Sequence, residues 1–149
     1  MKLSLTTADL LAQLQTVTRV ASTRSAVQAL SGVKLDAPAD APTRLLATDM
    51  DVGVSVPLAA DVSQSGSAVL PARLLLDVVR ALPAPELTLE LRSAQSDVEL
   101  VCGSATFHLR LLRAEDFPAL PSPSDENRVT LPADAFVHTV TRVARVQAG

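Results

Sequence analysis

The sequence predicts an α+β fold made of duplicated units, each consisting of a strand, a helix and three further strands. The first observation behind this prediction is a strand-into-helix pattern that occurs three times in the 149 residues. It begins near Leu5, recurs 64 positions later at Val69, and recurs 62 positions after that at Leu131. The second observation is that alternating apolar and polar residues follow the first two helices, as expected of half-buried strands. Repeats of about 60 residues indicate one structural unit used more than once.

The first unit opens with residues 2–6, whose alternation predicts a strand. Thr7 is a suitable N-cap for a helix over residues 8–20. The apolar face of this helix is formed by Leu10, Leu11, Leu14 and Val17. A polar loop that carries Arg24 follows the helix, and residues 63–67 are expected to form a turn. Between them, three short strands are expected at residues 30–36, 43–49 and 51–58.

The second unit repeats this order. A strand ends at Leu70, and Pro71 suits the opening of a helix over residues 71–82. The residues expected on its apolar side are Leu74, Leu75, Val78 and Leu82. Strands follow at residues 86–93, 96–102 and 104–112. We expect the helices of the two units to lie side by side on one face of an antiparallel sheet.

A third unit opens at Arg128, after a proline-rich, charged stretch over residues 115–126 that is typical of a domain boundary. A helix is expected over residues 133–147, but no three strands follow it. Its apolar face consists of Phe136, Val137 and Val140. One helix cannot bury such a face alone. We therefore expect residues 1–122 to form one domain, residues 123–149 to be the opening strand and helix of a second, incomplete domain, and the chain to be the start of a longer protein.

Composition narrows the classes of function. Apolar residues make up 48% of the chain, with no Trp and no Tyr, so the chain lacks the aromatic surface on which single-strand binders stack bases. No apolar run approaches the roughly 18 residues of a membrane span, and we expect a cytoplasmic protein without a signal peptide. Cys102 is the single cysteine, which excludes an intrachain disulfide framework and a cysteine-based zinc cluster. No cofactor is expected.

Charge is distributed unevenly over the predicted elements. The net charge is −3, and most acids fall in strands and loops. The helix acids Asp9, Asp77 and Asp134 are placed in or near first turns, where the helix dipole favours them. The outward helix faces carry mostly basic residues: Arg19, Arg73, Arg80, His138, Arg142 and Arg145. This pattern favours a polyanion that approaches from the helix side and is held by phosphate contacts. Ordinary solvated helix faces are the alternative explanation.

Three motifs resemble a known family in their order and spacing: ATDMDVGVSV at 47–56, VLPARLLLDVVRALP at 69–83 and AEDFPALP at 114–121. They are similar to the first domain of the bacterial DNA polymerase III beta subunit, the sliding clamp. The resemblance implies a DNA-clamp fold in which each subunit has three such domains and two subunits join head to tail in a ring around duplex DNA. It also implies a non-catalytic processivity factor that tethers the replicative DNA polymerase, with the helices lining the hole.

The resemblance assigns roles to particular residues. It places Arg24 and Arg73 where the family contacts DNA without sequence preference. It places Phe107 and Leu109 at the apolar positions of the strand that pairs with the other subunit of the homodimer. The positions that are basic in the best-known pattern are Ser104 and Thr106 here. The pocket for DNA polymerase III and clamp-loader peptides belongs to the second and third domains of the family, so these partners are expected to bind outside this chain.

Two other classes of function are weighed against a DNA clamp. A non-DNA interaction scaffold would use exposed sheet edges, which the strand pattern also supplies. An enzyme would need a nucleophile with a base, paired carboxylates or a metal cluster. His108 and His138 lie on predicted polar faces without an evident triad partner, and Cys102 is more often a small buried hydrophobe. Asp49 and Asp51 lie in a strand connection, where carboxylates usually fix the turn.

Overall fold

The computed structural model describes residues 1–22, 25–121 and 128–147 and confirms an α+β fold. The helices are α1 (Thr7–Val17), α2 (Ala72–Arg80) and α3 (Ala133–Gln147), with short 3-10 turns η1 (Gln28–Ser31) and η2 (Ala114–Asp116). The strands are β1 (Lys2–Thr6), β2 (Gly32–Ala37), β3 (Arg44–Thr48), β4 (Gly53–Pro57), β5 (Asp61–Gln64), β6 (Gly66–Pro71), β7 (Glu86–Arg92), β8 (Asp97–Cys102) and β9 (Ala105–Arg110). Within these described ranges, no helix is long and apolar enough to cross a membrane.

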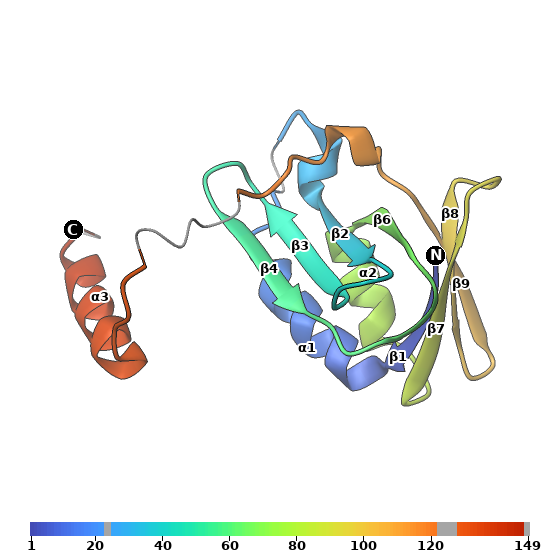
Figure 1. The fold of residues 1–149 in the computed structure, drawn as a ribbon, viewed down its shortest axis with the longest axis horizontal. Coiled ribbons are helices and arrows are strands. Elements are labelled where there is room, and N and C mark those ends of the chain that lie inside the picture. The colour runs from blue at the N-terminus through green and yellow to red at the C-terminus, as the bar shows by residue number, and fades with distance from the viewer. Residues whose placement is uncertain (23–24, 122–127, 148–149) are drawn as a thin grey trace.

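The strands form two antiparallel sheets (Figure 1). The five-stranded sheet has the order β5-β1-β7-β8-β9, and the four-stranded sheet has the order β4-β3-β2-β6. The two repeat units exchange their first strands: β1 of the first unit pairs with β7 of the second, and β6 of the second unit pairs with β2 of the first. Each sheet therefore needs strands from both units.

Each unit also returns to its own first strand. β5 pairs with β1 and places Val62 opposite Leu3. In the second unit the return is a single bridge between Leu112 and Val69 of β6, in which the Leu112 N–H donates to the Val69 carbonyl oxygen at 2.9 Å. The predicted turn at 63–67 was too long, because β5 extends to Gln64 and β6 starts at Gly66. β5 itself was not predicted from the sequence.

α1 starts close to its predicted position but ends earlier than predicted. Its buried residues are Leu10, Leu14 and Val17. The N-cap is one residue earlier than predicted, because the Asp9 N–H donates to Thr6 Oγ1 at 3.2 Å. Thr7 Oγ1 instead donates to the Ala84 carbonyl oxygen at 2.8 Å, which ties the start of α1 to the second unit. The helix ends at Val17, three residues before the predicted end at residue 20.

α2 buries a face that differs from the predicted one. Its buried residues are Ala72, Leu75, Leu76 and Val79. Leu74, which was predicted to join the core, is 50% exposed, and Val78 is only half-buried. The three consecutive leucines fit two neighbouring helix faces equally well by spacing, and packing against α1, β2 and β6 selects the second and third of them.

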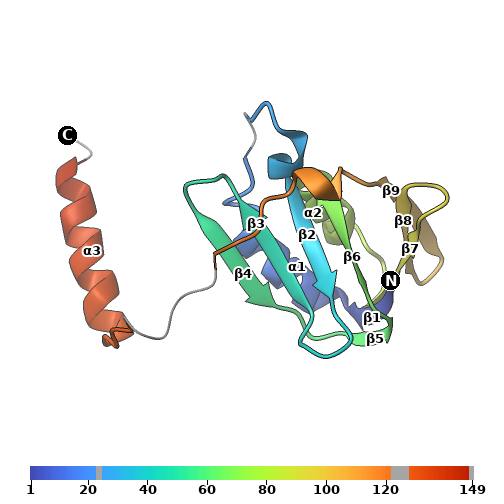
Figure 2. The ribbon, with the colours of Figure 1, turned by 45° about the horizontal axis from the view of Figure 1, so that its top comes forward.

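The predicted arrangement of the first two helices is confirmed. α1 and α2 pack against each other, and both cover the four-stranded sheet: α1 contacts β3 and β4, and α2 contacts β2 and β6. Figure 2 shows both helices on the same side of these strands. The helix pair thus forms one layer whose other side is open to solvent.

The core lies between the helix pair and the two sheets and is aliphatic. Leu3, Leu89 and Leu100 form a cross-strand row in the five-stranded sheet and are fully buried. Phe107 of β9 lies opposite Leu100 at the end of this row. Burial of each such side chain stabilises the fold by about 1.5–3 kcal/mol. Cys102 is buried as well, as predicted for a small hydrophobe.

The connection between β3 and β4 is fixed by a side chain. Asp49 Oδ1 accepts hydrogen bonds from the N–H groups of Asp51 and Val52, at 3.0 and 2.8 Å. A carboxylate that bonds the backbone two and three residues ahead is a common way to close a turn. The predicted turn role of Asp49 is therefore confirmed.

Candidate nucleic-acid interface

α2 presents two arginines and one aspartate along its exposed side. Arg73, Asp77 and Arg80 are spaced at i, i+4 and i+7, which places them in one stripe along a helix. All three side chains are exposed, and the opposite side of α2 is buried against α1 and the four-stranded sheet. Phosphate groups can therefore reach both guanidinium groups without disturbing the core.

Asp77 and Arg80 form an ion pair within this stripe. Arg80 Nη1 lies 3.6 Å from Asp77 Oδ1, and the two side chains are 53% and 63% exposed. An exposed pair of this kind is weak in water, so phosphate can compete for Arg80. The prediction that Asp77 lies near a first helical turn was wrong: α2 starts at Ala72 and has no acid in its first turn. The helix dipole therefore gives no reason for an acid at this position.

α1 does not supply matching arginines. The positions 64 residues before the α2 stripe are occupied by Asp9, Gln13 and Thr16. The Asp9 carboxylate accepts a hydrogen bond from the Ala59 N–H at 3.0 Å and thereby holds the chain after β4. Arg19 is exposed, but it lies two residues beyond the end of α1 and not on the outward helix face as predicted. Within the described helix pair, the basic stripe belongs to α2.

The remaining predicted DNA contacts are distributed differently. Arg24 lies outside the described residues. Arg142 and Arg145 lie on α3, one turn apart, and His138 lies on the same helix. All three of these α3 side chains are exposed. Within residues 1–22 and 25–121, the two predicted arginines that lie on the same element are thus Arg73 and Arg80, both on α2.

β9 is an edge strand, as the predicted subunit contact requires. Its two candidate side chains are nevertheless covered to different degrees. Leu109 is 2% exposed, and Phe107 is half-buried and packs against the core. Strand alternation places both on the core face, where the rest of the domain covers them. Leu109 is thus covered and Phe107 partly covered within this chain, and their assignment to the subunit contact stays a prediction.

The open feature of β9 is its backbone. A two-residue turn joins β8 to β9, so Cys102 and Ala105 form a hydrogen-bonded pair. Bonded and non-bonded pairs then alternate along the hairpin, and the bond from the Leu111 N–H to the Ser96 carbonyl oxygen, at 3.1 Å, continues the bonded series. The backbone groups directed to the open edge are consequently those of Thr106, His108 and Arg110.

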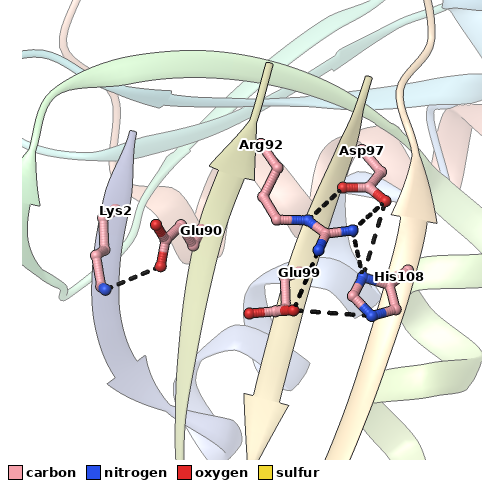
Figure 3. A network of polar contacts seen from close by, with 6 residues as sticks. All are labelled: Lys2, Glu90, Arg92, Asp97, Glu99 and His108. Carbon is pink, nitrogen blue, oxygen red and sulfur yellow. Dashed lines mark hydrogen bonds and ion pairs between the residues drawn. The ribbon is translucent and has the colours of Figure 1, made fainter. Parts of the chain in front are cut away.

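A charged network covers the solvent face of the five-stranded sheet (Figure 3). Arg92 donates from Nε and Nη2 to the two carboxylate oxygens of Asp97, at 2.9 and 2.7 Å. Its Nη1 lies 3.5 Å from Glu99 Oε2. Its Nη2 lies 2.9 Å from Nδ1 of His108 on β9. His108 is exposed, as predicted, but its place between two carboxylates and Arg92 was not predicted.

Hydrogen bonding within this network shifts the pKa values of its members. The hydrogen bonds from Arg92 hold the pKa of Asp97 below its ordinary value, and they raise the pKa of Arg92. Lys2 Nζ lies 2.8 Å from Glu90 Oε2, which lowers the pKa of Glu90 and raises that of Lys2. Lys2, Arg92 and their acidic partners on this face are therefore paired with one another, whereas Arg73 on α2 has no ion pair within the described residues.

Two features of the surface were not predicted from the sequence. The Asp77–Arg80 pair has a signal in the sequence, because opposite charges at i and i+3 meet on a helix. The network around Arg92 has no comparable signal, because its members are brought together only by the register of β7, β8 and β9.

Known proteins resemble this chain in both sequence and structure. The family described as DNA polymerase III beta subunit, N-terminal domain, matches residues 1–121. A beta sliding clamp of Synechocystis sp. is 38% identical over 138 residues, which cover 89% of this chain and 35% of that protein. A solved DNA polymerase sliding clamp from Bacillus subtilis is 26% identical with a TM-score of 0.86, over 94% of this chain and 38% of that one. The solved Caulobacter crescentus pol III beta is 31% identical with a TM-score of 0.75, over 82% of this chain and 33% of that one.

The chain spans about a third of the length of the curated relatives it matches. The family match includes both sheets, α1 and α2, and therefore the stripe of Arg73, Asp77 and Arg80. This chain belongs to the family of the DNA polymerase III beta subunit N-terminal domain.

Proposed function

We propose that this chain provides the first domain of a sliding clamp, a ring that encircles duplex DNA and tethers the replicative DNA polymerase. Membership of the family supports the proposal, as do relatives that are named beta sliding clamp. A clamp of this kind raises processivity by staying linked to DNA, so it needs no catalytic group and no cofactor. We place this activity in the cytoplasm.

The exposed stripe on α2 is the observation that carries the proposal. Arg73 and Arg80 face solvent on the helix side of the domain, and only Arg80 has a weak ion pair there, whereas Lys2 and Arg92 on the solvent face of the five-stranded sheet are each paired with acids. Exposed guanidinium groups bind phosphate without reading bases, which suits a protein that moves along DNA. Duplex DNA is thus the proposed partner. Further candidate contacts are Arg19, Arg24, Arg142 and Arg145.

The proposal also covers domain organisation. Residues 1–122 form one domain, and residues 123–149 open the next. Support comes from α3, whose apolar side chains Phe136, Val137 and Val140 are exposed, because an amphipathic helix gains most of its stability by burying that face. In the first domain, β1 and its helix are completed by strands of the following unit. α3 would be completed in the same way by a further unit of the full-length subunit.

Assembly and protein partners follow from the same proposal. Two full-length subunits form a ring, and the open backbone edge of β9 pairs with the other subunit. DNA polymerase III and the clamp loader bind other domains of the subunit.

The DNA-facing role of α2 is tested in the full-length subunit by Arg73→Glu, alone and together with Arg24→Glu. The measurement is primer-extension length on a long, single-primed circular template, run beside a thermal melt. We expect shorter products at an unchanged melting temperature, because a reversed charge repels phosphate at an exposed position. The matched control is Arg44→Glu, which reverses an exposed charge on the solvent face of the four-stranded sheet and should leave product length unchanged. Wild-type product length from both Arg73 variants would count against the proposal.

A further inference from the structure

The acid in the middle of the α2 stripe is not explained by the helix dipole. Asp77 lies between Arg73 and Arg80 on the same exposed side, and it is outside the first turn, where the helix dipole would favour it. Its carboxylate lies 3.6 Å from Arg80 Nη1. The equivalent position in α1 is the uncharged Gln13, so the repeated unit does not require an acid here.

We propose that Asp77 attenuates DNA binding: its carboxylate competes with phosphate for Arg80, so that α2 presents one free guanidinium group and one whose phosphate contact is weakened. This inference rests on the proposed function and adds a residue that tunes it. A ring that encircles DNA does not need strong phosphate contacts to stay bound, and strong contacts would slow its movement along the duplex. An acid beside one of two arginines keeps such contacts weak while leaving Arg73 available.

The physical consequence is measurable in salt. Each additional phosphate contact makes the slope of log K against log salt steeper by about 0.9 for duplex DNA. Removal of the Asp77 charge frees Arg80 for such a contact. Between 50 and 200 mM salt, the variant should therefore lose about 3.5-fold more affinity than the wild type. At the lower salt concentration it should bind several-fold more tightly.

The experiment is an NMR titration of the 149-residue chain with two 16-base-pair duplexes of unrelated sequence, which also reports folding through the amide spectrum. The variants are Asp77→Asn and Asp77→Gln, which remove the same charge with different side chains. Glu86→Gln is the matched control, because it removes one exposed acid from the solvent face of the five-stranded sheet. Arg80→Gln is combined with Asp77→Asn to test whether any gain depends on Arg80.

We expect both Asp77 variants to bind both duplexes more tightly, with the steeper salt slope, and Glu86→Gln to show neither effect. The gain should disappear in the Arg80→Gln background. Equal affinities for Asp77→Asn, Asp77→Gln and Glu86→Gln would overturn the inference, as would a gain that persists without Arg80. If neither duplex perturbs the α2 resonances of the wild type or of any variant at low salt, the proposed DNA contacts of α2 fail and the inference fails with them. Duplex binding that is the same for the wild type and the Asp77 variants would overturn the inference alone.

Discussion

Arg92 donates two parallel hydrogen bonds to Asp97, from Nε at 2.9 Å and from Nη2 at 2.7 Å, and so joins the end of β7 to the start of β8. This fork geometry is the strong form of an arginine–carboxylate pair. It holds the pKa of Asp97 below its ordinary value. The stability contributed by Asp97 should therefore be fully present above about pH 4, the value of an unfolded aspartate, and should be lost as the pH falls through the lowered pKa of the folded state.

The prediction is that Asp97→Asn destabilises the chain at pH 7 and that the difference from the wild type shrinks toward pH 3. Urea unfolding at both pH values measures it. Asp36→Asn, which removes a carboxylate from the four-stranded sheet, serves as the comparison. A difference between wild type and Asp97→Asn that is the same at both pH values would contradict the linkage.

Gly32 and Gly53 are expected to respond differently to alanine. A Cβ at Gly32 would lie 2.8 Å from side-chain atoms of Leu112 and Val69 and 3.0 Å from the Leu70 carbonyl oxygen, so backbone would have to move. A Cβ at Gly53 would meet the end of the flexible Leu120 side chain at 2.8 Å. Gly32→Ala should cost about 1–3 kcal/mol of the free energy of unfolding, and Gly53→Ala should cost clearly less. Equal losses in chemical denaturation would show that the contact at Gly32 relaxes freely.

Replacement of Leu109 is expected to lower the stability of the folded chain and not to affect subunit assembly directly. It is fully inside the core of this chain, so Leu109→Ala should lower the free energy of unfolding by about 2–5 kcal/mol. Thr106→Ala, on the exposed side of the same strand, should change it by less than about 0.5 kcal/mol. Denaturant titration of the 149-residue chain measures both. A Leu109→Ala chain as stable as the wild type would contradict the observed burial.

The β9 edge offers a separate test of assembly. The Thr106 N–H is directed to the open edge, where proline is tolerated because no ladder bond within the chain is lost. Thr106→Pro should therefore leave the melting temperature of the 149-residue chain nearly unchanged and shift the full-length subunit from dimer to monomer in sedimentation. Thr106→Ala is the matched control and should remain dimeric. An unchanged dimer for Thr106→Pro would remove β9 from the interface.

Most of the fold could be predicted from the sequence, because the repeat is visible in it directly. The strand-into-helix starts at Leu5 and Val69 both exist, and the two helices lie side by side as predicted. At the third start, near Leu131, residues 128–132 form no strand and only the helix α3 is present. The exchange of β1 and β6 between the units could not be predicted from the sequence. The paired strands are far apart in the chain, and the packing of the whole domain decides such pairing. β5 escaped because its residues are mostly exposed and give no alternating pattern.

The candidate site was predicted less completely, for physical reasons that differ between residues. The exposure of Arg73 followed from the helix pattern, since arginine is seldom buried without a partner. The outward position of Leu74 did not follow, because three adjacent leucines satisfy more than one helix face. Leu109 shows the limit of alternation, which identifies the face a side chain occupies but not whether its own chain or another subunit covers that face.

The most direct test of a ring around DNA is retention of the labelled full-length subunit on circular DNA before and after a single cut. The subunit is loaded onto a nicked plasmid by a clamp loader, isolated by gel filtration at high salt, and half of the sample is then linearised with a restriction enzyme. High salt removes proteins that are held by phosphate contacts alone. We predict that the subunit stays with the circle and leaves the linear molecule by sliding off its ends. Equal retention on circular and linear DNA, or release from both at high salt, would contradict a topological clamp.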